Sequence, residues 1–131
     1  MTTPPLQLSR IGQIAMPVQD VERATKFWRD VLGVHFLFAA PGLAFFDCGG
    51  IRVMLSPPEP KGQNPSGSIL YFRVDDIAAA HAALVAKHVH FEEVPRLIHR
   101  AADHDLWIGA FRDSEGNLLA LMSEVRPQPT R

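Results

Sequence analysis

The sequence is poor in cysteine and has no surplus of charge of either sign. Thirteen Lys and Arg residues stand against fourteen Asp and Glu residues, so the formal net charge is -1. A nucleic-acid-binding surface needs clustered Lys and Arg, and the sequence contains no such cluster, so we expect no nucleic-acid partner. Cys48 is the only cysteine and cannot form an internal disulfide, which favours a reducing, cytoplasmic location.

Long apolar runs are also missing. A helix that spans a bilayer needs about 20 apolar residues, and no run approaches that length. The opening stretch MTTPPLQLSR has no apolar core or cleavage site of a signal peptide. We therefore expect a protein with no membrane partner, and its 131 residues are enough for one domain with a core of its own.

What the sequence does contain is the same design twice. The segment 13–36 reads QIAMPVQDVERATKFWRDVLGVHF, and 69–91 reads ILYFRVDDIAAAHAALVAKHVHF. Each opens with an apolar strand and reaches an Asp, Asp20 or Asp76, placed where a helix N-cap belongs. An apolar helical pattern follows, and Gly33 and His88 stand at the two helix ends, where a left-handed residue is expected.

Each half then continues into two more strands. LAFFDCGGIRVMLS turns at Gly49 and Gly50, and LWIGAFRDSEGNLLALMS turns at SEGN. The order βαβββ–linker–βαβββ predicts an α+β fold in one domain, 1–131, with module 1 at about 11–56, a linker at 57–67 and module 2 at about 68–124. One module cannot bury its apolar face alone, so we expect the two to pair into a curved mixed sheet with a concave ligand cup.

Strand alternation sorts the side chains between this cup and the core. The cup face is mostly apolar with a few polar groups, which is the usual form of a small-molecule site. Two other interpretations stay open, in which these side chains fill the cup themselves or bury a dimer contact. The residues predicted to face the cup are Gln13, Ala15, Pro17, Arg52, Met54, Ser56, Ile69, Tyr71, Arg73, Leu118, Ala120 and Met122.

The second half is longer than the first, and the additional residues lie around PRLIHRAADHD. We interpret 96–107 as a loop, and loops with several ionisable side chains on a rigid scaffold are common functional sites. His99 is the candidate general acid or base, tuned by Asp103 or Arg100, and Arg100 and Trp107 are candidate ligand contacts. A solvated loop without chemistry is the alternative, and a metal bound by His99 and His104 stays open, although no third donor has a compelling position.

Two motifs resemble a known superfamily. Gln13-x6-Asp20 followed by VERATKFWRDVLGV, and the ending FRDSEGNLLALMS, are similar to the opening and the end of the vicinal oxygen chelate superfamily. That group includes glyoxalase I, extradiol dioxygenases, fosfomycin-resistance transferases and bleomycin-resistance proteins. The resemblance covers about residues 11–124 and implies the paired-module fold, a small-molecule ligand and a homodimer, but it does not fix the reaction.

The resemblance also implies where a metal would be held. Carried onto this chain, the four ligand positions of metal-dependent members are Gln13, Met54, Ile69 and Ala120. Gln13 fits the pattern, but Ile69 and Ala120 have no donor atom, and the thioether of Met54 suits chiefly copper(I). We therefore expect no metal site of the usual kind and no cofactor.

Three functional hypotheses follow. The first is a metal-independent small-molecule-binding protein of the glyoxalase/bleomycin-resistance type, in a homodimer. The second is a glyoxalase-like lyase, isomerase or related enzyme that uses the 96–107 loop with His99 as its catalytic residue, and the third is a structural or partner-binding module. For either small-molecule function, the expected ligand-binding residues are Gln13, Arg52, Met54, Ile69, Tyr71, Arg100, Trp107, Ala120 and Met122.

Overall fold

The computed structural model describes residues 6–58 and 67–126; most of the predicted linker, 57–67, lies outside them. The first module contains β1 (Gln13–Pro17), α1 (Val21–Lys26), a π-helical turn η1 (Phe27–Val31), β2 (His35–Ala40), β3 (Leu43–Cys48) and β4 (Ile51–Ser56). The second contains β5 (Leu70–Arg73), α2 (Ile77–Ala86), β6 (Phe91–Arg100), β7 (Asp105–Arg112) and β8 (Leu118–Val125).

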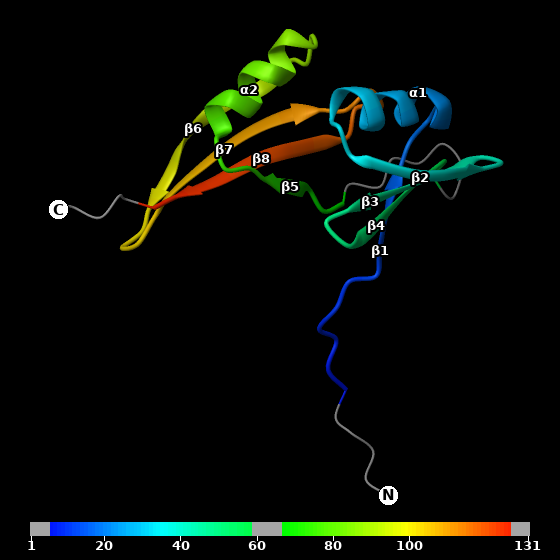
Figure 1. The fold of residues 1–131 in the computed structure, drawn as a ribbon, viewed down its shortest axis with the longest axis horizontal. Helices are drawn as coiled ribbons and strands as arrows, with labels where there is room; N and C mark the ends of the chain where they lie inside the picture. Colours follow the sequence, from blue (N-terminus) through cyan, green and yellow to red (C-terminus); the bar gives the residue numbers. More distant parts are fainter. Residues whose placement is uncertain (1–5, 59–66, 127–131) are drawn as a thin grey trace, which may run out of the picture.

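Each module forms its own four-stranded mixed sheet. The strand orders are β1-β4-β3-β2 and β5-β8-β7-β6, with β1 parallel to β4, β5 parallel to β8 and the other pairs antiparallel. The two sheets stand side by side, and both helices lie on the same side of the molecule, at the top of Figure 1. The predicted α+β fold of two βαβββ modules is confirmed, and the sheets are open: among the described residues, no ladder joins the edge strands β1 and β5.

The helices begin where the sequence predicts. The carboxylates of Asp20 and Asp76 accept hydrogen bonds from the backbone N–H groups of Arg23 and Ala79, both at 3.0 Å. These bonds satisfy amide groups that the first helical turn leaves unpaired. At the far ends, Gly33 and His88 have φ angles of 73° and 67°, so both adopt the left-handed conformation. The repeat in the sequence is therefore a repeat in backbone geometry.

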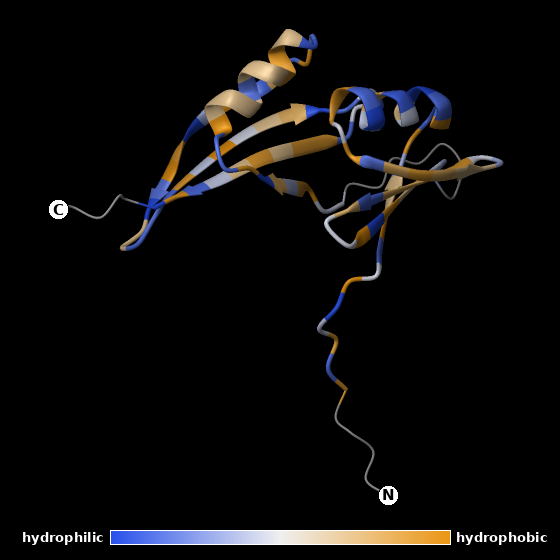
Figure 2. Ribbon diagram, viewed as in Figure 1, coloured by the Kyte–Doolittle hydropathy of each residue, from blue (hydrophilic) through white to orange (hydrophobic). Residues whose placement is uncertain are grey.

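Each helix covers one face of its own sheet. Trp28 is completely buried between the modules' sheets, with its ring 6.2 Å from Phe46 and 6.0 Å from Phe72. Figure 2 shows many hydrophilic residues along α1 and few along α2. The core residues alternate with exposed ones along the strands, as half-buried strands require. The buried strand residues on the helix side are Met16, Ala44, Phe46, Val53, Leu55, Phe91, Phe111, Leu119 and Leu121.

Polar contacts fix the junction between the modules. The Glu115 carboxylate, at the β7–β8 turn, accepts from the backbone N–H groups of Gln19 and Asp20 at 3.0 and 2.7 Å. It also pairs with the Arg23 guanidinium through bonds of 2.7 and 3.0 Å. Because these donors surround it, the pKa of Glu115 is lowered to about 2 despite its burial. The start of the first helix is thereby tied to the second module.

The interpretation of 96–107 as a loop is wrong. β6 continues to Arg100 and β7 begins at Asp105, so the additional residues lengthen a β-hairpin and leave a turn only at 101–104. Leu97 is opposite Trp107, and His99 is opposite Leu106. His99 and Arg100 sit on the exposed edge strand β6, where charged side chains are common because they discourage edge-to-edge pairing. Asp103 and His104 lie in the remaining turn.

Candidate functional site

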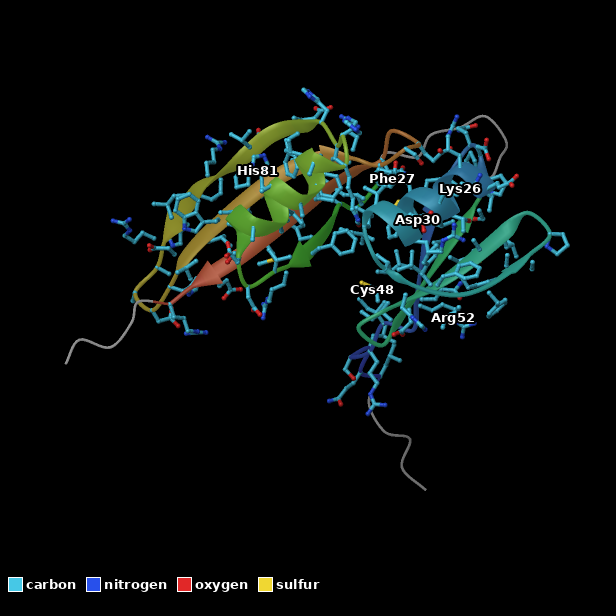
Figure 3. All side chains as sticks on the ribbon, turned by 45° about the horizontal axis from the view of Figure 1, so that its top comes forward. Lys26, Phe27, Asp30, Cys48, Arg52 and His81 are labelled. Carbon is cyan, nitrogen blue, oxygen red and sulfur yellow. The ribbon has the colours of Figure 1, made fainter. Side chains whose placement is uncertain are left out.

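We call the face of each sheet that is directed away from its helix the open face. On the first sheet, one row of side chains across this face is polar. Gln13 is in register with Arg52, Arg52 with Asp47, and Asp47 with His35. Side chains that face each other in register point to the same side of a sheet, so all four strands contribute to this polar row. Figure 3 labels Arg52 on this sheet.

The next row on the first open face is apolar. Ala15 is in register with Met54, Met54 with Phe45, and Phe45 with Phe38. The rings of Phe38 and Phe45 are stacked, with centroids 4.6 Å apart and planes inclined by 27°, and Phe38 is 48% exposed. The Arg52 guanidinium carbon lies 5.8 Å from the centroid of Phe45, within cation–π range. This apolar row offers a flat aromatic surface next to a cation.

The second open face carries the residues predicted from β5 and β8. Tyr71 is in register with Ala120, and Arg73 with Met122. Tyr71 is half exposed, whereas Ala120 is buried at the centre of the sheet. Ile69 precedes β5 and is exposed. On this face, Ile69, Ala120 and Met122 are apolar, and Tyr71 and Arg73 supply a phenol and a guanidinium group.

The additional hairpin residues divide between the two faces. His99, opposite Leu106, lies on the open face, because Leu106 is in register with Glu124 on the same face of β8 as Ala120 and Met122. Trp107 packs against the hydrophobic core on the helix side. Arg100, opposite Asp105, shares that side, and its Nε lies 3.2 Å from an Asp105 carboxylate oxygen. The structure therefore places His99 with the other predicted residues and separates Arg100 and Trp107 from them.

A small charged cluster surrounds the tip of this hairpin. His104 Nδ1 lies 2.8 Å from an Asp103 carboxylate oxygen, and its Nε2 lies 3.7 Å from one of Glu124. Glu124 also pairs with Arg73 at 3.1 Å. Hydrogen bonds from His104 and Arg126 lower the pKa of Asp103. Because these groups are mutually paired, the cluster stabilises the hairpin tip and leaves His99 outside it.

The four positions that would hold a divalent metal do not offer a suitable donor set. On the first sheet, the Gln13 amide Nε2 lies 3.9 Å from the sulfur of Met54. On the second, Ile69 and Ala120 are aliphatic. Divalent metals of this kind bind to nitrogen and oxygen donors, typically several per site, and here only the Gln13 amide can supply one. Within the described ranges, His, Cys, Asp and Glu side chains form no group of three or more that could hold a metal.

A hollow of about 660 Å³ lies where the two modules meet. Ala15 and Pro17 of β1 line it together with Ile69 and Leu118 of the second module. The side-chain amide of Asn117 donates to the backbone oxygen of Pro17 at 2.8 Å and holds this edge in place. Open-face residues of both modules therefore reach one hollow at the end of β1, but Gln13 and Met54 lie beyond it.

Sequence reasoning missed four residues of the first open face. Phe45 and Asp47 could have been found from the alternation of side chains between the two faces of a strand, since in LAFFDC they alternate with Ala44, Phe46 and Cys48. His35 and Phe38 could not, because a register shift between Phe36 and Phe38 breaks the alternation along β2. A β-bulge of this kind depends on the partner strand and has no local signature here.

Comparison with known proteins identifies the class. A family model of the Glyoxalase/Bleomycin resistance protein/Dioxygenase superfamily matches residues 10–121, and the chain belongs to this superfamily. No curated protein matches it in sequence. In the described part of the chain, no helix is long and apolar enough to cross a membrane.

Several solved structures have a similar fold. A lactoylglutathione lyase from Agrobacterium tumefaciens is 24% identical with a TM-score of 0.68, over 92% of this chain and 96% of that one. A superfamily member from Sphaerobacter thermophilus DSM 20745 is 22% identical with a TM-score of 0.74, over 91% and 100%. An integron cassette protein from the mobile metagenome of V. cholerae is 25% identical with a TM-score of 0.69, over 91% and 98%.

Proposed function

We propose that this chain is a small-molecule-binding protein of the glyoxalase/bleomycin-resistance type that holds an apolar, preferably aromatic ligand without a divalent metal. The observation that carries the proposal is the composition of the open faces. Phe38, Phe45 and Tyr71 present aromatic surface there, while the implied metal positions offer only one amide donor. Exposed apolar patches with a few polar groups are typical of ligand or partner sites. The proposal includes a cytoplasmic location, because a chain with a single cysteine cannot form an internal disulfide and fits a reducing compartment.

A homodimer is part of the proposal. In one chain the two open faces belong to separate sheets, and β1 and β5 are edge strands without an outer partner among the described residues. A second copy that brings its β5 edge to β1 would cover both edges and place one open face opposite the other. The ligand would then lie between residues of the two copies.

The oligomeric state is measured by size-exclusion chromatography with light scattering. We expect a dimer at micromolar concentration, and the mass of a single chain across that range would contradict this part of the proposal.

Metal analysis of the purified protein tests the claim of metal independence. Mass spectrometry of the digested protein should find Ni, Zn, Mn and Fe far below one ion per chain. A positive control is the combined change Met54→Glu, Ile69→His and Ala120→Glu, which supplies three donors beside Gln13. It should gain a metal if the four positions converge in the dimer. One tightly held ion per unmodified chain would contradict the proposal.

Ligand binding is tested by thermal shift with planar aromatic compounds. A compound at 100 times its Kd stabilises the folded state by about 2.7 kcal/mol. Phe38→Ala and Tyr71→Ala should reduce the shift, because each removes aromatic contact area from an open face. Val85→Ala is the control, since Val85 is an exposed apolar residue of α2, on the helix side of the second sheet. If the ligand-induced thermal shift falls as much in the control as in the other two variants, the ligand is not bound on the open faces.

An enzymatic function is the second candidate, and the position of His99 on the open face favours it. An imidazole beside an apolar ligand site can act as a general acid or base near neutral pH. For a lyase or isomerase, His99→Ala would abolish turnover and leave ligand binding intact. His90→Ala is the matched control, because His90 is an exposed histidine just before β6, and it should leave both turnover and binding unchanged. Loss of binding in His99→Ala would instead make His99 a ligand contact.

A further inference from the structure

A second cleft lies on the helix side of the molecule, and its lining reaches the second open face at Arg73. Its volume is about 440 Å³, within the range of small-molecule sites. Leu32 and Val34 from the end of the first helix form one wall, and Ala80, Ala83 and Leu84 of α2 form the other, with Phe72 of β5 also in the lining. Both modules therefore contribute apolar walls to the cleft.

An unusual backbone segment lies at one margin of this cleft. The first helix ends in the π-helical turn η1, where the backbone N–H of Leu32 donates to the oxygen of Phe27 at 3.0 Å. Gly33, with its left-handed φ angle, then turns the chain away at the margin of the cleft. On the opposite wall, Ala80 and Ala83 are too small to fill the space. π-Helical turns occur frequently at functional sites, and here one lies beside an unfilled apolar cleft.

The charged residues that line the cleft are both cations, Arg73 and Lys87. Arg73 is neutralised by Glu124. The Lys87 ammonium donates to the backbone oxygen of Asp30 at 3.0 Å, and none of the ion pairs found among the described residues includes it. The pKa of the nearby Asp30 carboxylate is lowered by its hydrogen bond with Arg29 and also by the charge of Lys87, but that carboxylate is itself paired with Arg29 at 2.8 Å. An ammonium group has three donors, so Lys87 can receive an anion at the rim of an apolar space.

We propose that this interhelical cleft binds a small amphipathic anion, with an alkyl or aryl body between the helices and a carboxylate on Lys87. The apolar walls provide the hydrophobic contribution, and Lys87 selects the charged end. The site is independent of the ligand proposed for the open faces. Because the walls come from both modules, the ligand stabilises the junction between them.

The test is calorimetric titration of the full chain with decanoate and with decanol. Decanoate should bind at one site per chain. Decanol lacks the charge, so it should bind about fivefold more weakly, which is the difference expected from the loss of one partly exposed ion pair. Lys87→Gln should weaken the binding of decanoate by about the same factor and leave the affinity for decanol unchanged. Lys26→Gln is the control, because Lys26 is an exposed lysine of α1 outside this cleft. Equal affinity of decanoate for Lys87→Gln and the unmodified chain would overturn the proposal.

A second pair of variants locates the site. Ala83→Phe fills the cleft and should abolish binding of both compounds. Ala82→Phe, at the neighbouring exposed position outside the lining, should leave binding intact and controls for a bulky group on α2. Tyr71→Ala should also leave decanoate binding unchanged. If Tyr71→Ala removed binding and Ala83→Phe did not, decanoate would occupy an open face, which would overturn this inference and leave the proposed function standing.

Discussion

At the scale of the residue, His88 shows that the two helix ends share one geometry but not one residue type. His88 has a φ of 67°, where the first module has Gly33 at 73°. A side chain at such an angle places Cβ against the backbone and costs roughly 1–2 kcal/mol, partly offset by the greater entropy that glycine loses on folding. The sequence predicted this conformation from the position of His88 in the repeat alone.

His88→Gly should therefore stabilise the chain by about 0.5–1 kcal/mol, measured by urea unfolding monitored by circular dichroism. The His88 side chain is exposed and takes part in no hydrogen bond or ion pair found among the described residues, so no contact should be lost. The control is His90→Gly, two residues on and without a positive φ, which should be neutral or destabilising. Equal stabilisation by both changes would contradict the backbone explanation.

The open-face residues mark the limit of residue-scale prediction. Alternation along β1 and β4 correctly separates Met16 and Val53, which are buried, from Gln13 and Arg52, which are exposed. The same alternation could not predict the face on which His35 lies, because the register shift in β2 comes from the pairing of β2 with β3. Parity works where a strand is regular and fails at a bulge.

At the scale of the element, the long β6–β7 hairpin depends on a proline next to a glycine. Pro95 lies in β6 within the register shift between Glu93 and Arg96, as expected for a residue that cannot donate to a β-ladder. Gly109 of β7 is buried directly against it. A Cβ on Gly109 would lie 2.9 Å from Pro95 Cγ and 3.0 Å from the Pro95 backbone nitrogen. The glycine is required by this close approach.

Gly109→Ala should destabilise the chain by about 1–3 kcal/mol, because the added methyl group overpacks a buried site that includes rigid backbone. Thermal unfolding by calorimetry gives the measurement. Gly12→Ala provides the control, since a Cβ there has no atom within 4 Å and should change stability by less than about 0.5 kcal/mol. A Gly109→Ala protein as stable as the control would show that β6 moves aside freely.

The hairpin also shows why one element was assigned wrongly. Within 96–107, the dense ionisable residues are as compatible with a loop as with an edge strand, so local composition does not decide. The pairing of Leu97 with Trp107 and of His99 with Leu106 decides it. The helices were easier, because the Asp20 and Asp76 caps act within three residues.

At the scale of the whole molecule, Glu115 connects the modules, and its connection depends on pH. Its side chain is fully buried and bonded to Arg23 and to the backbone at the start of the first helix. Its pKa is about 2 in the folded protein against an ordinary value of 4.5. The stabilisation is therefore complete above about pH 4.5 and is lost as the pH falls toward 2.

Glu115→Gln should lower the free energy of unfolding at pH 7 by about 2–3 kcal/mol, since the pKa shift corresponds to at most about 3 kcal/mol. It should also flatten the loss of stability between pH 4.5 and 3, as measured by urea unfolding at several pH values. Glu92→Gln is the control. Glu92 pairs with Arg112 at 2.7 Å, but both side chains are about half exposed, so this pair should contribute less than about 1 kcal/mol to the free energy of unfolding. An unchanged acid profile in Glu115→Gln would place the pH dependence elsewhere.

The repeated βαβββ order, the helix caps and the alternation of core residues along the regular strands follow from the sequence, because each depends on a few neighbouring residues. The sequence also provides the residue types at the four positions that the superfamily resemblance implies for a metal. The separation of the two sheets, the placement of His99 but not Trp107 on an open face, and the cleft between the helices became visible in the folded molecule alone. Those features depend on strand register and on how two completed modules meet, and both are set by contacts between residues far apart in the chain.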